Sequence, residues 1–352
     1  MANQPILPWP GAAFAIASAV LFGLSTPLAK LLLGAVDPWL LAGLLYLGSG
    51  LGLALWRLAR PATAEAPLRR ADLPWLAAAV LIGGVAGPVL LMLGLARTEA
   101  AAAALLLNLE GLATIAIAWW VFHESADRRI VAGAIAILAG AALLAWDGRG
   151  IGLGWGALLV AGACLAWGID NNLTRRVASA DPVLIAMTKG LAAGAANVGL
   201  AALQGAALPS AAPAAGAAVV GFFGYGASLV LFVLALRHLG AARTGAYFSA
   251  APFVGAALAI VLLGEPVTVR LLIAAALMGL GLYLHLAERH EHEHTHDAAE
   301  HEHRHSHDAH HRHAHEAQVP PGEPHTHWHR HAPMTHRHPH YPDPHHRHDH
   351  RH

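Results

Sequence analysis

Apolar residues in the first 287 positions form ten long runs, separated by short clusters of charged residues, Gly and Pro. A helix of about 20 predominantly apolar residues is long enough to cross the hydrocarbon core of a bilayer. Each run has roughly that length. The pattern predicts an all-α polytopic membrane protein with ten transmembrane helices, at about 11–33, 38–58, 73–96, 99–121, 128–147, 152–174, 182–204, 213–236, 242–263 and 269–287.

The runs fall into two similar halves. Residues 237–265 have a weaker copy at 97–124, where Glu124 and Glu265 are 141 positions apart (265 − 124). Two further blocks match at offsets of 145 and 144: Gly23–Lys30 with Gly168–Arg175, and Asp37-Pro38 with Asp181-Pro182. Chance similarity between helices rich in Ala, Leu and Gly is the alternative explanation.

Each half contains five predicted helices, an odd number, so the second half lies upside down relative to the first. Such inverted repeats support alternating access to a site near the bilayer midplane. We predict one repeat at 11–147, a second at 152–287, and a separate tail at 288–352.

Basic residues in the loops predict the orientation, because cytoplasmic loops carry an excess of Lys and Arg. With a cytoplasmic N-terminus, the inner loops receive eleven basic residues and the outer loops four. Both termini are therefore expected in the cytoplasm, with the protein in the inner (plasma) membrane. The four outer residues are Lys30, Arg97, Arg149 and Arg270.

Composition agrees with a membrane protein, since the chain is 56% hydrophobic and only 12% charged. The formal net charge of +0 averages two unlike regions, and the lone Cys164 excludes a disulfide framework. No Gly-rich phosphate loop, nucleophile triad or zinc-protease spacing occurs, so we expect neither an enzyme nor a nucleic-acid partner.

The second half resembles the EamA-type family of the drug/metabolite transporter superfamily. Its resemblance is carried by Trp167-Gly168, Arg175, Pro252, Gly264-Glu265 and Gly279/Gly281. The first half departs from the pattern, with Gly111 where Pro252 would map and His123-Glu124 in place of Gly-Glu. The resemblance covers residues 11–287 and implies a secondary transporter of small metabolites, without indicating which metabolite.

Polar residues within the spans are the best pointers to a substrate site, because they are costly in a bilayer. Glu110 lies midway along the fourth span, where an apolar setting favours its protonated form and suits proton coupling or cation binding. Lys189 is expected to pair with Glu110 or Asp170, to bind an anionic substrate, or to snorkel to the interface. Glu124 and Glu265 are interpreted mainly as helix caps and salt-bridge partners.

The densest polar run within a span is Asp170-Asn171-Asn172, of which at least one residue must face the bundle interior. Its repeat mates are Ser25, Thr26 and Pro27, and Pro27 is expected to break its helix. Interhelical hydrogen bonding is the alternative role for these residues. The predicted substrate-binding set is Glu110, Asn108, Asp170, Asn171, Lys189, Ser25 and Thr26.

The tail holds 24 of the 27 histidines, mostly as His-X-His repeats, and is expected to be disordered. Dense imidazoles bind divalent Zn, Ni, Co or Cu and become charged near pH 6. A solubilising low-complexity segment is the alternative. The predicted metal ligands are His292, His294, His301, His303, His305, His327, His329, His331, His346 and His348.

Two functions remain open from the sequence. One is a metabolite carrier whose tail binds metal as a regulator, with no required cofactor. The other is a transition-metal transporter whose tail collects or senses its cargo; the spans argue against it, because they contain no cluster of His and carboxylates. Expected partners are the lipid bilayer, a small-molecule substrate, divalent metal ions and a second copy in a homodimer.

Overall fold

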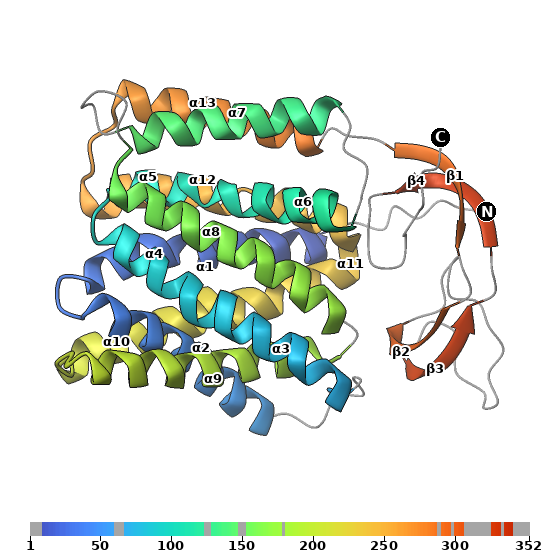
Figure 1. Cartoon of the computed structure of the whole chain (residues 1–352), viewed down its shortest axis with the longest axis horizontal. Helices are drawn as coiled ribbons and strands as arrows, with labels where there is room; N and C mark the ends of the chain where they lie inside the picture. The colour runs from blue at the N-terminus through green and yellow to red at the C-terminus, as the bar shows by residue number, and fades with distance from the viewer. Residues whose placement is uncertain are drawn as a thin grey trace.

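Helices of the protein run side by side along one direction in the computed structural model (Figure 1). The structure describes residues 9–59, 67–122, 128–146, 153–177 and 180–286, together with four short segments of the tail. The first half comprises α1 (Trp9–Leu32), α2 (Pro38–Leu58), η1 (Arg70–Asp72), α3 (Leu73–Ala79), η2 (Val80–Ala86), α4 (Gly87–Leu95), α5 (Ala100–Leu106), α6 (Asn108–Phe122) and α7 (Arg128–Ala145).

The rest of the membrane part is also helical. Its helices are α8 (Trp155–Thr174), η3 (Arg175–Val177), α9 (Pro182–Leu203), α10 (Ala211–Gly221), η4 (Phe222–Ala227), α11 (Ser228–Phe248), α12 (Ala251–Leu263) and α13 (Val269–Leu286). The segments η2 and η4 are π-helical, and they begin 142 residues apart (222 − 80).

Seven stretches in the described part of the chain are long and apolar enough to cross a membrane. They are Gly11–Leu32, Pro38–Leu58, Arg70–Leu95, Ala100–Val121, Arg128–Ala145, Pro182–Leu203 and Ala211–Ala235. Of the other three predicted spans, 152–174 and 269–287 correspond to α8 and α13, whereas 242–263 is divided between the end of α11 and α12. Helices α12 and α13 are apolar but shorter than the seven. These stretches make the protein a multi-pass membrane protein, and ten spans remain a prediction.

Two details of the predicted helices are wrong. Helix α11 continues through 237–241, where the sequence predicts a loop between two spans. That segment contains no Pro, and Arg237, Leu239 and Ala241 are good helix formers that offset the single Gly240. Helix α1 also continues past Pro27, which was expected to break it. Proline removes one backbone hydrogen bond, and packing along α1 is sufficient to keep the helix intact.

The Asp-Pro pairs begin equivalent helices in the two halves. The Asp37 side chain accepts hydrogen bonds from the N–H groups of Trp39 and Leu40, at 2.9 and 3.3 Å. The Asp181 side chain accepts from Val183 and Leu184 at the same two distances. Each Asp is thus an N-cap and each Pro occupies the first turn.

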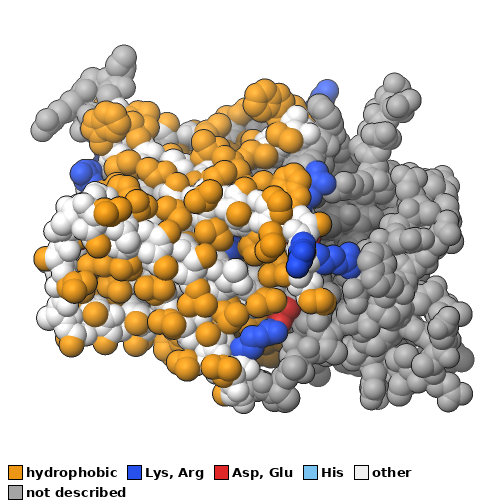
Figure 2. All heavy atoms as spheres, turned by 60° about the horizontal axis from the view of Figure 1, so that its bottom comes forward, with side chains coloured by type: hydrophobic (Ala, Val, Ile, Leu, Met, Phe, Trp, Pro, Cys, Tyr) orange, Lys and Arg blue, Asp and Glu red, His pale blue; other side chains and the backbone are white. Residues whose placement is uncertain are grey.

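Apolar side chains cover the middle of the face shown in Figure 2, while Lys and Arg gather mainly toward one end. Many large apolar residues on the helices are exposed, as expected for surfaces that contact lipid.

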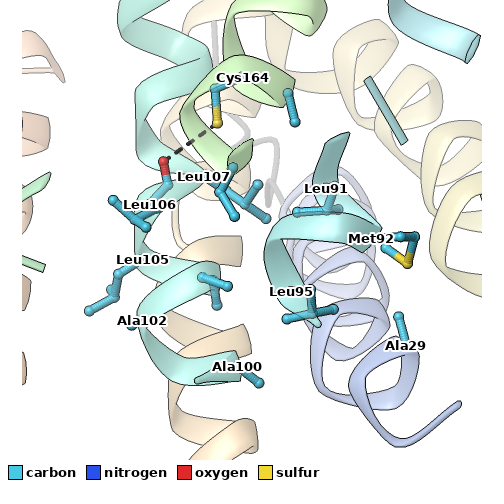
Figure 3. Packing of buried hydrophobic residues seen from close by; sticks show 14 of the residues in the cluster. Ala29, Leu91, Met92, Leu95, Ala100, Ala102, Leu105, Leu106, Leu107 and Cys164 are labelled. Carbon is cyan, nitrogen blue, oxygen red and sulfur yellow. Dashed lines mark hydrogen bonds between the residues drawn. The ribbon is translucent and has the colours of Figure 1, made fainter. Parts of the chain in front are cut away.

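In the interior, small residues allow helices to approach closely. Helices α7 and α13 pack together where Gly133 meets Gly281. The main core is formed by α4, α5 and their neighbours, with Leu91, Met92, Leu95, Leu105 and Leu106 fully buried (Figure 3).

Four described segments of the tail are strands, and disorder of the tail as a whole stays a prediction. The alternating His-X-His pattern has the two-residue period of a strand, which is compatible with extended pairing. Two-stranded sheets of this kind are only marginally stable alone in water. Strand β1 (His290–His296) pairs antiparallel with β4 (Met334–His340), and β2 (Ala299–His305) pairs antiparallel with β3 (His325–His331).

Candidate substrate site

The fourth predicted span changes character at Leu107, where the helix is interrupted between α5 and α6. Every residue of α5 is buried, with no residue more than 9% exposed. Every described side chain of α6, in contrast, is half-buried or exposed. Helix α5 packs against α12, whereas α6 packs mainly against α8. The break therefore separates a buried half of this span from a more exposed one.

Glu110 lies in the first turn of α6, directly beyond this break. Its Oε1 accepts a hydrogen bond from Asn171 Nδ2 at 3.0 Å, and the same amide lies 3.1 Å from Thr114 Oγ1. Asn171 is exposed and Glu110 half-buried, although Glu110 lies midway along the fourth predicted span. Polar side chains at this depth are costly against lipid, so they favour a water-accessible path here.

A second polar cluster lies on α8 and α9. The Lys189 ammonium is 2.6 Å from each carboxylate oxygen of Asp170, and it also lies 3.4 Å from Thr174 Oγ1. The Thr174 hydroxyl donates to Asp170 Oδ1 at 2.9 Å. Their side chains are 8% exposed for Asp170 and 17% for Lys189. Lys189 thus pairs with Asp170, one of the alternatives left open by the sequence.

The π-helical segment η2 supports the Asp170 cluster. The Gly83 carbonyl accepts from the Trp167 indole N–H at 2.9 Å and from the Tyr46 hydroxyl at 3.3 Å. A side chain at Gly83 would collide with the Asp170 carboxylate, so the glycine permits this close approach. π-Helical turns often occur at functional sites because they redirect backbone groups. Here the two hydrogen bonds to the Gly83 carbonyl connect η2 to α2 and α8.

Aromatic side chains continue the site toward the second half. The rings of Tyr46 and Tyr225 have centroids 5.6 Å apart, and Phe22 lies 6.0 Å from Tyr225. Phe22 also meets Phe248 at 5.5 Å. Tyr225 belongs to η4, so both π-helical segments contribute to the same region. Residues from α1, α2, α6, α8, α9 and η4 line one polar and aromatic site.

Several predicted residues occupy other positions. Asn108 donates to the Leu105 carbonyl at 2.8 Å and supports the helix break instead of joining Glu110. Ser25 is buried, donates to the Phe22 carbonyl at 2.6 Å and lies against Gly224 of η4. Thr26 is buried within α1. Glu265 is a cap, as interpreted, whereas Glu124 lies outside the described residues.

Sequence reasoning missed five side chains of this region. Thr114 and Thr174 each follow a predicted acidic residue by four positions, the spacing of neighbours on one helical face. That spacing was a usable signal. The aromatic partners have no local signal, because helices distant in sequence bring them together. The five residues are Thr114, Thr174, Tyr46, Tyr225 and Trp167.

Within the described residues, no group of three or more His, Cys, Asp or Glu side chains has the geometry to hold a metal ion. The side chains of the histidines predicted as metal ligands in the tail lie outside the described part of the structure. Metal binding by the tail therefore stays a prediction.

Known proteins place the chain in a family. The profile of the EamA-like transporter family matches it twice, over residues 9–146 and 154–287. An uncharacterized transporter of Methanothermobacter thermautotrophicus is 27% identical over 279 residues, covering 72% of this chain and 79% of the relative. A crystal structure with 23% identity superposes with a TM-score of 0.58, covering 78% of this chain and 95% of that one.

The chain belongs to the EamA-like transporter family. Members of this family are membrane transporters of small substrates, and this class agrees with the apolar helices and with the resemblance seen in the sequence. A transporter family is not a class of enzymes, and its members occupy a lipid bilayer.

Proposed function

We propose that the protein is a secondary carrier that moves a small metabolite across the inner membrane by alternating access. The observation that carries this proposal is the polar site of Glu110, Asn171, Asp170 and Lys189, which lies within helices yet stays partly accessible. Polar groups at this depth mark substrate pathways in membrane proteins.

An inverted repeat of five plus five helices is part of the proposal. It is supported by the family profile, which matches the chain twice, and by two π-helical segments 142 residues apart (222 − 80). The equivalent N-caps at Asp37 and Asp181 add a further pair, 144 residues apart (181 − 37). Carriers built this way alternate by rocking one repeat against the other around the site.

The proposed resting state is closed at the end that holds Lys30 and Glu265. Support comes from α5, which is buried against α12 there, and from α6, which remains accessible toward the opposite end. With eleven basic residues on the proposed inner loops and four on the outer, the closed end faces outward and both termini are cytoplasmic. The site would then open to the cytoplasm.

The tail is proposed to bind Zn, Ni, Co or Cu as a cytoplasmic regulator. The support is its density of His-X-His repeats, since neutral imidazole is a strong ligand for these metals. We do not favour metal as the cargo, because the described residues of the membrane part contain no metal-binding group of His, Cys, Asp or Glu.

Metabolite profiling tests the proposed function. Cells expressing the wild type or Glu110→Gln would be compared by mass spectrometry of cell extract and medium. We expect specific small molecules to redistribute with the wild type and not with Glu110→Gln, at equal amounts of protein in the membrane. Asp72→Asn, on the exposed η1 segment, is the matched control and should behave as wild type. Identical profiles for wild type and Glu110→Gln would contradict the site.

A further inference from the structure

We infer that the cargo is an organic monocation with an aromatic or similarly flat apolar part, held by the Glu110 carboxylate. This inference rests on the proposed function and names the substrate class of the same site.

The first argument is the balance of charge. Three charged side chains meet in the site: Glu110, Asp170 and Lys189. Lys189 contacts both oxygens of Asp170 at 2.6 Å, so these two form a neutral pair. Among the described side chains no Lys or Arg forms an ion pair with Glu110, whose contact is the neutral amide of Asn171. An ionised Glu110 leaves the site with one uncompensated negative charge.

Beyond Lys189, whose charge is matched by Asp170, the described residues of the neighbouring helices add no positive charge near Glu110. The titratable groups near Glu110 are Asp170 and Cys164 on α8, Lys189 on α9, Tyr46 on α2 and Tyr225 on η4. The tyrosines and the cysteine are neutral at physiological pH. A single positive charge on the substrate would therefore restore neutrality in a region where an isolated charge is costly.

The second argument is the aromatic surface. Tyr46, Tyr225 and Phe22 form a continuous group, with neighbouring ring centroids 5.6 and 6.0 Å apart. Aromatic faces attract cations within about 6 Å and also stack against flat apolar groups. Trp167 contributes less, since it is buried, with only 6% of the residue exposed.

The same contacts disfavour an anion or a zwitterion. Among the described contacts, Lys189 is the one cationic group at this site, and it is occupied by Asp170 and also contacts Thr174, so a carboxylate or phosphate would find no available cation there. Separating that half-buried pair would leave the Asp170 carboxylate without its partner, which is strongly unfavourable. The pair therefore disfavours substrates that carry a negative group of their own.

Three probes of similar size test the substrate class. The full chain in lipid nanodiscs would be titrated calorimetrically at pH 7.5 with 2-phenylethylammonium, phenylalanine and 3-phenylpropanoate, which carry net charges of about +1, 0 and −1. We expect the cation to bind at least tenfold more tightly than the other two. Glu110→Gln should weaken cation binding at least tenfold. Thermal unfolding of each variant shows that it is folded.

Two variants of the ion pair sharpen this test. Asp170→Asn leaves the Lys189 ammonium uncompensated and should abolish the preference for the cation. The double variant Asp170→Asn with Lys189→Met removes both charges, keeps Glu110 as the only one, and should retain the preference. Loss of cation binding in the folded double variant would overturn the inference.

The outcomes separate the substrate class from the function. Preferential binding of phenylalanine or 3-phenylpropanoate, or no binding of any probe, overturns the cation class. The proposed carrier then still stands if the metabolite profiles depend on Glu110. If those profiles are indifferent to Glu110→Gln while the cation binds, transport through this site is wrong and the cation site remains.

Discussion

Glu265 caps α5 at Ala100, 165 residues earlier in the chain. Its two carboxylate oxygens accept hydrogen bonds from the N–H groups of Ala100 and Ala101, at 2.6 and 2.7 Å. Lys30 reaches the same turn from α1 and donates to the carbonyl oxygens of Leu95 and Thr98, at 2.6 and 2.8 Å. Two oppositely charged side chains thus fasten the turn between α4 and α5 and close this end of the bundle.

Replacing Glu265 by Ala should open that end. The change removes two hydrogen bonds from a charged acceptor, each contributing about 1.5–3 kcal/mol. We expect a larger population open at this end, measured as faster labelling of Thr98→Cys by a membrane-impermeant maleimide. Cys164 is buried and serves as an internal negative control. Glu99→Ala, on the same turn, is the matched control, and equal labelling in both variants would contradict the closing role of Glu265.

Asp170→Ala should weaken substrate binding more than Glu265→Ala. The first leaves the half-buried Lys189 ammonium without its partner, at a cost of about 3–5 kcal/mol, whereas the second alters only the closed end. Competition binding with the substrate found by profiling measures both affinities. We expect at least a tenfold loss for Asp170→Ala. The opposite ranking would move the site to the ends of the helices.

Gly83→Ala and Gly111→Ala form a matched pair. An added methyl group at Gly83 would collide with the Asp170 carboxylate and displace it from Lys189, so we expect lower thermal stability and loss of transport. At Gly111 nothing lies within 4 Å of the added atom, so the variant should behave as wild type. Thermal unfolding in detergent and transport in vesicles check both. A silent Gly83→Ala would contradict the packing of η2 against the site.

Truncation after Arg289 should abolish binding of Zn or Ni without loss of transport. Imidazole binds metal only when neutral, so affinity of the full chain should fall as pH decreases below about 6.5. Calorimetry of both versions with ZnCl2 between pH 6 and 8 tests this. Equal affinity with and without the tail would place metal binding elsewhere.

Cell metal content, measured by mass spectrometry, distinguishes metal as a regulator from metal as the transported substrate. A change in metal content that Glu110→Gln abolishes would make the metal the cargo.

Sequence reasoning predicted most of the helices because apolar runs of spanning length carry a strong local signal. It also predicted Glu110, Asp170, Asn171 and Lys189 as candidates, since each is a polar residue in an apolar run. It failed at Pro27 and at 237–241, where local breaking signals did not interrupt the helix. The Asn108 amide donates to the Leu105 carbonyl, and its predicted role in substrate binding stays a prediction.

The sequence by itself determined that this is an apolar, helical membrane protein of the EamA type, with carboxylates inside its helices. Those properties depend on composition and on neighbours along the chain. Only the tertiary structure decided that Lys189 neutralises Asp170 while Glu110 lacks a cationic partner among the described residues. It also decided that Glu265 fastens α5. Such pairings depend on which helices pack together, and no local pattern specifies contacts between residues as far as 165 positions apart.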